Sequence, residues 1–426
     1  MHRQHPGQAA PPRQGLSPLG TDEVSQESAT DDPAPLAGVR VVEMSMYVQG
    51  PVCGLTLASL GADVIKIEQV GQEDVMRGFS SLFGVTLDDR GKEWIYASLN
   101  RNKRSLALDV ASEAGRPVFE RLIEQADVFI SNMRESALAK HGADPETLHR
   151  INPRLVYARG AGFGIRGPLA DDPCQDTVGM AYGGFMDATA NGDTPNYPPG
   201  SMSDVLTGTT MASGVMAGLV KRGITGKGCV VGTSQVQSLL WLQLQGVGLA
   251  ATTGQRMERF APDATTNPLF TVYPTSNGWL AIACLRADHW RALAAALGLD
   301  WMLEDPRFAR FGDLIRNRDE FRPLFTEHLA TNTTDHWWQI LRSAGIWSSP
   351  VRRLEELAAD EHVLANEYLV TYDDGFVGPP APFEIDGFRG ARGLAAEYSE
   401  HTDEILAELG YSEDEIVMLR ADSAIW

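Results

Sequence analysis

Residues 35–68 read PLAGVRVVEMSMYVQGPVCGLTLASLGADVIKIE. Residues 39–44 of this stretch are mostly apolar and β-branched, which favours a strand, and Gly50 then marks a turn. Residues 55–60 continue with apolar side chains at helical spacing, and residues 64–68 form a second strand-like run. A strand, a turn, a helix and a strand in this order make one βαβ unit. The stretch therefore predicts a parallel sheet.

The turn between the first strand and its helix bears on the ligand. A dinucleotide site needs glycines that let the backbone approach a pyrophosphate, but residues 49–54 read QGPVCG, with Val52 where the second glycine would stand. Glu68 does end the second strand, where a ribose would bind. Because the glycine pattern is missing, the sequence argues against a nicotinamide enzyme.

The alternation of strands and helices continues downstream. The expected elements are strands at residues 105–110, 128–131 and 155–160 and a helix at residues 116–125. This pattern is typical of a doubly wound α/β domain, with helices on both faces of a parallel sheet. Glycine and proline then gather in residues 183–200, which marks a long loop before a helix that begins near Asp204.

A second, smaller α+β domain is expected after the large one. Residues 269–273 and 278–284 predict a hairpin, and helices follow at about residues 289–297 and 316–330, the second kinked or restarted at Pro323. The expected domain organisation is a flexible tail (1–34), a large domain (35–230), linker helices (231–265), the small domain (266–355), and a linker with a C-terminal segment that returns to the large domain (356–426).

Three further local features lead to predictions. Residues 239–251 are strongly apolar but too short to cross a bilayer, so we expect a buried helix. Thr402 and Ser412 are the expected N-caps of two C-terminal helices. The first 34 residues have almost no large apolar side chains, which predicts a flexible tail, and they lack the pattern of a secretory or import signal, so we expect a cytoplasmic protein.

Charge and cysteine usage restrict the partners. With 36 basic and 56 acidic side chains, the net charge is −20, which disfavours nucleic acid and anionic membranes. The four cysteines lie far apart without a CxxC pair or a histidine cluster, so neither a metal site nor a disulfide framework is indicated. Cys53, at the start of the first helix, is a candidate catalytic thiolate, although a packed thiol is the plainer interpretation.

Several stretches together resemble one family. Besides the opening, they are ADVFISNMRESAL (126–138), NPRLVYARGAGFGIRGPLA (152–170), DVLTGTTMASGVMAGLVKRGITGKG (204–228) and SEHTDEILAELGYSEDEI (399–416). Their order and spacing resemble the class III coenzyme A transferases of the CaiB/BaiF type, which include formyl-CoA and carnitine CoA-transferases and the 2-methylacyl-CoA racemases. The resemblance covers most of the chain from about residue 35 and implies an interlocked homodimer.

Asp204 is the residue that would carry the chemistry. A helix N-terminus stabilises a carboxylate, and a plain N-cap is the bland alternative. The resemblance implies that Asp204 is a nucleophile that moves coenzyme A from an acyl-CoA thioester to a carboxylic acid through anhydride and aspartyl-CoA thioester intermediates. No metal and no tightly bound cofactor are expected. Gly183 and Gly184 are candidates for backbone donors to the oxyanion, or else a flexible turn.

Coenzyme A carries phosphates, so an acidic protein needs a local basic region to bind it. Several basic residues that lie close together in sequence, among them Lys66, Arg101 and Arg134, could form such a region. For each of these side chains, the alternative is an ion pair on a solvated face. The residues expected to contact the coenzyme, by the resemblance or by this clustering, are Val48, Gln49, Gln69, Arg77, Lys103, Arg104, Asn132, Met133 and Lys140. Gln69 stands where family members often have arginine.

Two competing functions stay open. A racemase of this family uses an aspartate that matches Asp204 and a histidine, but this chain has Gln175 at the histidine position, and an amide is no general base near neutral pH. A non-catalytic member that only binds coenzyme A is the other alternative. The segment 259–275 has no glycine tetrad like that of formyl-CoA transferases, which argues against oxalate or formate as substrates. Gly232 replaces a common aspartate, for which we have no explanation.

Overall fold

The computed structural model describes residues 32–87, 93–256 and 265–426. Residues 1–31, which make up nearly all of the expected tail, lie outside the described residues, as does the first part of segment 259–275. Within the described ranges, none of the helices is both long and apolar enough to cross a membrane.

Six parallel strands form the central sheet, in the spatial order β5-β2-β1-β6-β7-β8. They are β1 (Arg40–Glu43), β2 (Asp63–Glu68), β5 (Lys103–Ala107), β6 (Val128–Ser131), β7 (Val156–Ala161) and β8 (Cys229–Ser234). The parallel sheet predicted from the sequence is confirmed. Strand order reverses between β1 and β6, so their carboxyl ends flank the switch point at which open α/β sheets bind ligands.

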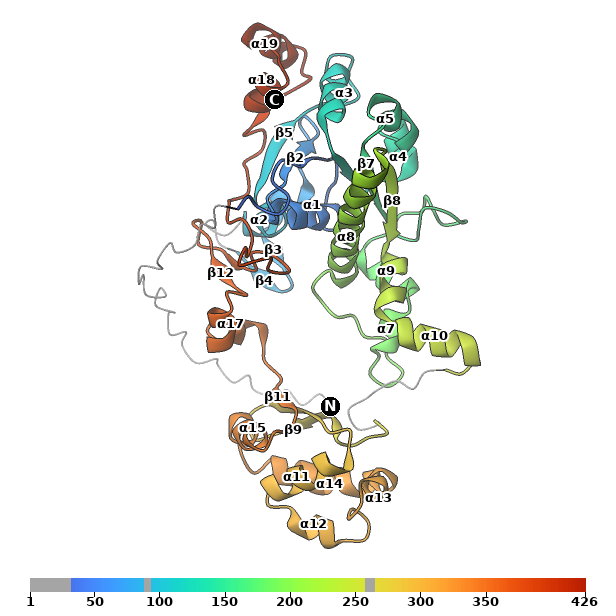
Figure 1. Cartoon of the computed structure of the whole chain (residues 1–426), viewed down its shortest axis with the longest axis vertical. Helices are drawn as coiled ribbons and strands as arrows, with labels where there is room; N and C mark the ends of the chain where they lie inside the picture. The colour runs from blue at the N-terminus through green and yellow to red at the C-terminus, as the bar shows by residue number, and fades with distance from the viewer. Residues whose placement is uncertain (1–31, 88–92, 257–264) are drawn as a thin grey trace, which may run out of the picture.

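Helices cover both faces of this sheet (Figure 1). Val41 packs with apolar side chains of α1 (Gln49–Ser59) and α8 (Met202–Thr225). The next residue, Val42, points to the other face and packs with α3 (Gly115–Gln125) and with the last two helices, α18 (Thr402–Glu408) and α19 (Glu413–Ala421). This alternation along one strand is why the sheet is buried on both sides.

Close contact between α1 and α8 positions the site. A Cβ atom on Gly208 of α8 would lie 2.5 Å from the Gln49 carbonyl oxygen and 2.7 Å from Cβ of Val52. Glycine is therefore required for this approach, since no side chain fits there. The contact brings the N-terminus of α8, with Asp204, beside the N-terminus of α1.

A three-stranded antiparallel sheet organises a separate core, in the lower part of Figure 1. Its strands are β9 (Phe270–Pro274), β10 (Trp279–Ala283) and β11 (Ser348–Pro350), and helices α11 (Ala287–Ala296), α14 (Arg318–Leu329) and α15 (Thr334–Ser343) pack on it. The hairpin is confirmed. The helix expected at about residues 316–330 is α14, which does not restart at Pro323 but continues through it. Tyr273 and Trp337 are core residues here, whereas Trp347 is exposed.

The chain then returns to the large sheet. The N–H of Asn102 donates to the Leu394 carbonyl, and the N–H of Asp109 donates to the Ala424 carbonyl. Ser412 caps α19 in a capping box, as predicted. The prediction for Thr402 is wrong, because it is the first residue of α18 and its hydroxyl instead accepts the N–H of Ala107 on β5.

Two other predictions need correction. The strand expected at residues 105–110 begins at Lys103 and ends at Ala107, because Lys103 and Arg104 pair with β2. The buried helix expected at residues 239–251 is two helices, α9 (Gln235–Leu242) and α10 (Leu244–Thr253), and no residue of α10 is buried. Trp241 is 72% exposed. The apolar sequence was therefore no guide to burial within this one chain.

Candidate active site

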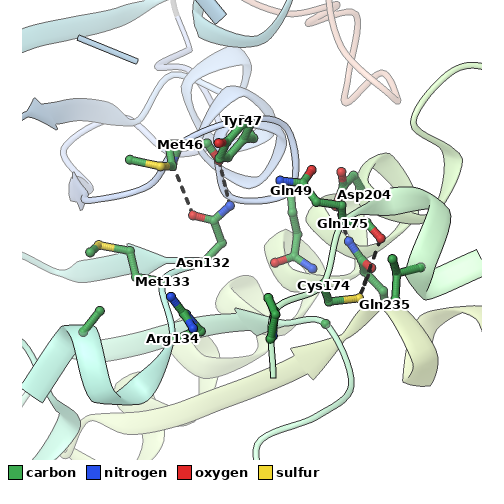
Figure 2. A pocket seen from close by; sticks show the side chains of 14 residues that line it. Met46, Tyr47, Gln49, Asn132, Met133, Arg134, Cys174, Gln175, Asp204 and Gln235 are labelled. Atoms are coloured by element: carbon green, nitrogen blue, oxygen red, sulfur yellow. Dashed lines mark hydrogen bonds between the residues drawn. The ribbon is translucent and has the colours of Figure 1, made fainter. Parts of the chain in front are cut away.

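A cavity of about 530 Å³ opens at the switch point of the large sheet. Its walls come from the loops after β1 and β6, from the loop before α6 (Asp176–Tyr182), and from the first turns of α8 and α9. The lining residues are Met46, Tyr47, Gln49, Asn132, Met133, Arg134, Ala137, Gly162, Pro173, Cys174, Gln175, Val178, Asp204 and Gln235. Figure 2 shows Asp204 and Gln235 at one end and Met133 and Arg134 at the other.

Asp204 lies in the first turn of α8 and is only 6% exposed. It is not the cap of that helix, because the cap position is Ser201. Asp176 on α6 instead accepts hydrogen bonds from the backbone N–H groups at the start of α8. Its Oδ1 accepts the N–H of Ser203 at 2.8 Å and that of Asp204 at 3.1 Å. The bland interpretation of Asp204 as an N-cap is therefore wrong, and its carboxylate is left free for the cavity.

One neutral donor holds the Asp204 carboxylate. Nε2 of Gln235, at the start of α9, donates to Oδ1 of Asp204 at 2.5 Å. The Cys174 thiol donates to Oε1 of the same glutamine at 3.1 Å. Burial and the nearby negative charge of Asp176 raise the pKa of Asp204 to about 7, while the Gln235 hydrogen bond lowers it. A carboxylate with this pKa is more basic than an exposed one and changes its protonation near neutrality.

The loop after β1 is tied to the loop after β6. Nδ2 of Asn132 donates to the Met46 carbonyl at 2.7 Å, and the N–H of Met46 donates to Oδ1 of Asn132 at 3.2 Å. Gln49 is buried and donates to the Ala161 carbonyl. Of the residues predicted from the sequence, the structure thus brings Asp204, Gln49, Asn132 and Met133 to one cavity. Val48 is buried behind the loop and does not line it.

A second cavity of about 610 Å³ continues from the first, since Met46 and Met133 line both. It lies at the carboxyl ends of β1, β2 and β5, and Gln69 is one of its lining residues. The two cavities offer room for an extended ligand that runs from Asp204 across the edge of the sheet. Lys140, at the end of α4 (Glu135–Lys140), is exposed and lines neither cavity.

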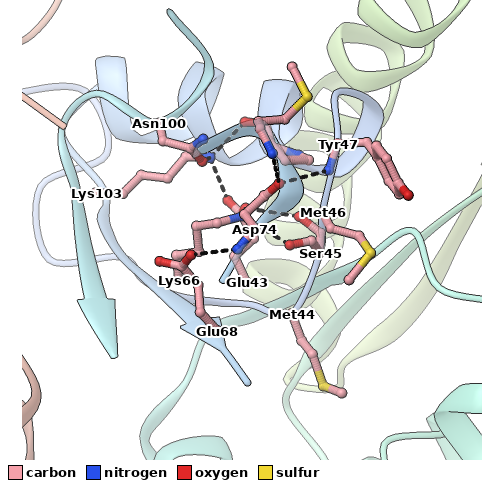
Figure 3. Close-up of polar contacts among 12 residues, drawn as sticks. Glu43, Met44, Ser45, Met46, Tyr47, Lys66, Glu68, Asp74, Asn100 and Lys103 are labelled. Carbon is pink, nitrogen blue, oxygen red and sulfur yellow. Dashed lines mark hydrogen bonds and ion pairs between the residues drawn. The ribbon is translucent and has the colours of Figure 1, made fainter. Parts of the chain in front are cut away.

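Lys103 belongs to a buried ionic cluster that also contains Glu43, Lys66 and Asp74 (Figure 3). It is 4% exposed, and its Nζ lies 2.8 Å from Oε2 of Glu43 and donates to Oδ1 of Asn100 at 2.9 Å. Lys66 lies 3.2 Å from Oε1 of the same Glu43 and 2.9 Å from Oδ2 of Asp74. Ammonium and carboxylate groups compensate one another here, which is the condition for burying charges.

Two predicted arginine contacts are also held by carboxylates. Arg77 makes two hydrogen bonds to Glu68, of 2.9 and 3.0 Å, and stacks on the ring of Tyr96. Arg104 pairs with Asp63 and Glu408, each at 2.8 Å. Lys103, Arg77 and Arg104 are thus engaged in ion pairs, the alternative that the sequence left open, and they line neither cavity. Their contact with a coenzyme stays a prediction.

The two glycines expected to stabilise an oxyanion do not line the cavity. The N–H of Gly183 donates to the Gly179 carbonyl at 2.8 Å, and that of Gly184 donates to the Ala181 carbonyl at 3.3 Å. Both donors are therefore engaged at the end of α6. They form the turn into α7 (Phe185–Ala188), with Gly184 at a φ of 76°.

Cys53 and Cys174 lie in different surroundings. Cys53 is fully buried, and burial raises its pKa, so it is a packed thiol and no nucleophile. Cys174 lines the cavity, and so does Gln235. Neither was singled out in the sequence, because an isolated cysteine and a glutamine before an apolar helix give no motif. Among the described residues, no group of His, Cys, Asp and Glu side chains could hold a metal ion.

Comparison with known proteins places this site in context. A model of CoA-transferase family III matches residues 36–398. The chain is 30% identical to the succinyl-CoA–D-citramalate CoA-transferase of Chloroflexus aurantiacus, covering 93% of this chain and all of that protein. It is 29% identical to the (R)-2-hydroxy-4-methylpentanoate CoA-transferase of Clostridioides difficile, with 89% and 97% covered.

The similar proteins also include a racemase and a protein of known structure. The human alpha-methylacyl-CoA racemase is 31% identical, with 92% of this chain and 97% of that protein covered. Among solved structures, a CaiB/BaiF family protein from Brucella suis superposes with a TM-score of 0.79 at 28% identity, over 89% of this chain and all of that chain. The family expected from the sequence is thus confirmed, and the solved structure supports the α/β fold with a parallel central sheet.

Proposed function

This chain belongs to CoA-transferase family III, and we propose that it moves coenzyme A between two carboxylic acids with Asp204 as the nucleophile. The observation that carries the proposal is the Asp204 carboxylate itself. It lies buried at the end of a cavity, free of its own helix and bonded to a neutral donor. A carboxylate in this setting is poorly solvated and strongly nucleophilic, which suits attack on a thioester carbonyl.

The proposed reaction balances without a metal or redox cofactor. The Asp204 carboxylate attacks the thioester carbonyl of the donor, the C–S bond breaks, and a mixed anhydride and coenzyme A thiolate form. The thiolate then attacks the aspartyl carbonyl, which releases the first carboxylate and leaves an aspartyl-CoA thioester. The acceptor carboxylate attacks this thioester, and the thiolate finally attacks the acceptor carbonyl. Each step forms one activated acyl bond as another breaks, and Asp204 is regenerated.

The two joined cavities support a placement for the coenzyme. We propose that its thiol arm passes between Met46 and Met133, which line both cavities, toward Asp204. Gln49 and Asn132 would face this arm. Gln69 in the second cavity is the proposed neutral contact to the nucleotide end.

The phosphates need cations, and two remain as candidates. Arg134 lines the first cavity, and Lys140 is exposed one helix away. Val48 would act indirectly, since its buried side chain supports the loop that lines the cavity. We propose Arg134 and Lys140 ahead of the other basic residues expected from the sequence, because most of those are engaged in ion pairs.

The racemase is the alternative function, because one of the similar proteins has that activity. Removal and return of an α-proton on opposite faces needs a second acid–base group besides Asp204. Gln175 lines the cavity at the position where the racemases have histidine, and its amide does not titrate in the physiological range. This observation favours transfer over racemisation.

We also propose that two chains form the working unit as an interlocked homodimer. Apolar side chains on α9 and α10 are exposed in the single chain, with Trp241, Leu244 and Leu249 prominent among them. An exposed apolar surface of this kind marks an interface. Acyl-CoA and the acceptor acid are the proposed small-molecule partners.

The test is mass spectrometry of the protein after incubation with a panel of acyl-CoA donors, with and without hydroxylamine. Hydroxylamine-sensitive coenzyme A adducts on the Asp204 peptide would support the proposal and identify the donor. An Asp204→Asn variant is the control, because its amide cannot form the anhydride. If no adduct forms but the α-proton exchanges in deuterated water, the racemase is the better assignment. If neither is seen, a binding-only protein is.

A further inference from the structure

The start of α9 and two hydrogen bonds hold Gln235 in the site. Ser234 caps α9, which sets Gln235 as the first residue of that helix at the end of β8. The glutamine is only 3% exposed, although its amide lines the cavity. Its two polar atoms are both engaged: Nε2 donates to Oδ1 of Asp204, and Oε1 accepts from the Cys174 thiol.

Two glycines leave the space that this arrangement needs. A Cβ on Gly179 of α6 would lie 2.0 Å from Oε1 of Gln235, and a Cβ on Gly162 would lie 2.0 Å from Cβ of Cys174. Neither distance is possible for a real side chain. The amide and the thiol are thus fitted into a slot between the loop after β7, α6 and α9.

The carboxylate and the thiol together fix which way the amide faces. A glutamine amide has one accepting and one donating end. The ionised Asp204 carboxylate only accepts and therefore takes the nitrogen, and the Cys174 S–H donates to the oxygen at the other end. A second acceptor, the Gln175 carbonyl, lies 3.6 Å from the same sulfur.

We propose that Gln235 is a positioning residue for the nucleophile: its amide, oriented by Cys174, fixes the Asp204 side chain and stabilises its charged form. This inference rests on the proposed function, in which Asp204 attacks the thioester. It assigns to Gln235 the selection of one carboxylate orientation, with Oδ1 bonded and Oδ2 available for attack. A neutral donor suits this role, because a cation in its place would lower the basicity of the nucleophile.

The charges around Asp204 show why a donor matters there. Asp176 on α6 opposes the ionisation of Asp204, and Cys174 is the titratable residue of the loop before α6 that lines the cavity. Arg134 lines the same cavity. The ionisable residue of α1, Cys53, is buried against Glu43. Helix α9 has no ionisable side chain, so the Gln235 amide is its contribution to the charge balance at Asp204.

The experiment measures the protonation of Asp204 directly. A diazo reagent esterifies protonated carboxyl groups with loss of nitrogen, so the labelling of the Asp204 peptide, followed by mass spectrometry across pH 5 to 10, reports the midpoint of its titration. Gln235→Leu removes the donor at similar volume. Gln235→Glu keeps the shape and adds a like charge, so that the test survives if the leucine variant fails to fold.

The matched control is Gln243→Leu. Gln243 ends α9 and donates to the Gly183 and Leu239 carbonyls, away from Asp204. We expect Gln235→Leu to raise the midpoint by about one pH unit, Gln235→Glu to raise it further, and Gln243→Leu to leave it unchanged. The low-pH limb of the pH dependence of kcat should move with this midpoint. The KM for acyl-CoA should stay within about twofold of the value for the parent protein.

The outcomes separate this inference from the proposed function. An unchanged midpoint in both Gln235 variants, with transfer intact, overturns the positioning role and leaves Asp204 as the nucleophile. A raised midpoint in a protein that transfers coenzyme A from no donor supports the positioning of Asp204 and sinks the transferase proposal. A parallel shift in the Gln243 control shows a general loosening of α9 and also overturns the inference.

Discussion

The Asp176 carboxylate accepts the backbone N–H of Asp204 at 3.1 Å, although the two residues belong to different helices. One aspartate thereby caps the helix on which the other is presented. The cap satisfies the α8 backbone through its Oδ1, while its buried Oδ2 has no hydrogen-bond partner among the described residues. Burial raises the pKa of Asp204, and the negative charge of Asp176 raises it further.

Asp176→Asn should lower the pKa of Asp204, in contrast to the Gln235 variants. The asparagine oxygen can still accept the N–H groups of Ser203 and Asp204, but the like charge is gone. We expect the acid limb of the kcat profile to move down by about one pH unit, read from initial rates of CoA transfer between pH 5 and 9. An upward movement would show that the cap, and not the charge, dominates the role of Asp176.

Asp204→Ala should abolish transfer while leaving coenzyme A bound. The alanine variant cannot form the anhydride, whereas the proposed contacts at Gln49 and Asn132 stay in place. We expect kcat to fall by roughly 10⁴-fold or more, with the affinity for free coenzyme A unchanged in calorimetric titration. Residual transfer within tenfold of the unmodified protein would remove Asp204 from the role of nucleophile.

Asp204 should also reduce stability at alkaline pH. Its folded pKa of about 7 lies above the ordinary value of an aspartate, so the folded state holds this proton more tightly than the unfolded state does. Stability is then lost as the pH rises from about 4 through 7. Asp204→Asn removes the effect and should be more stable than the parent by about 4 kcal/mol at pH 8, with little difference near pH 4.

Urea unfolding at the two pH values measures this directly. The sign is decisive: if the asparagine variant is less stable at pH 8, the Asp204 carboxylate is better accommodated than its burial indicates. If replacement of Asp204 stabilises the protein, then the proposed nucleophile reduces stability while it serves the reaction.

Sequence reasoning succeeded where a pattern fixes the backbone. The βαβ order of residues 35–68 determines a parallel sheet, and the glycine- and proline-containing loop at residues 183–200 marks the start of the helix that carries Asp204. It could not show the ion pairs of Lys103 and Arg104, because runs of basic residues look the same whether they face a ligand or a carboxylate. The partners, Glu43 and Asp63, are 60 and 41 residues away, and only the sheet brings them together.

The same reason explains the residues that were missed. Cys174 and Gln235 are separated by 61 positions and meet only when α9 packs beside the loop before α6. Residues 239–251 were predicted to be buried because they are apolar, yet a single chain leaves α10 exposed. Apolar sequence indicates that a surface will be covered, but not which chain covers it.

Lys103→Met and Lys140→Met test which of these two basic residues contacts the coenzyme. Loss of Lys103 removes one cation from buried Glu43, so we expect a stability loss of about 3 kcal/mol in urea unfolding and no change in KM for acyl-CoA. Exposed Lys140 should give the reverse, with stability within about 0.5 kcal/mol and a KM raised several-fold. A raised KM at full stability in the Lys103 variant would restore that residue to the coenzyme site.

Interlocking of two chains can be distinguished from ordinary dimerisation. The apolar surface of α9 and α10, which includes Trp241, should be buried by a second copy, so the protein should sediment at twice its mass of 46.4 kDa. If the chains pass through one another, tagged and untagged copies will co-purify when expressed together, but will not exchange when mixed after folding, because exchange requires unfolding. Trp241→Asp should reduce the dimer yield, whereas Leu354→Asp, at another exposed apolar position, should not. Exchange within hours of mixing would indicate an ordinary dimer, and a protein that sediments as a single chain would contradict the assembly altogether.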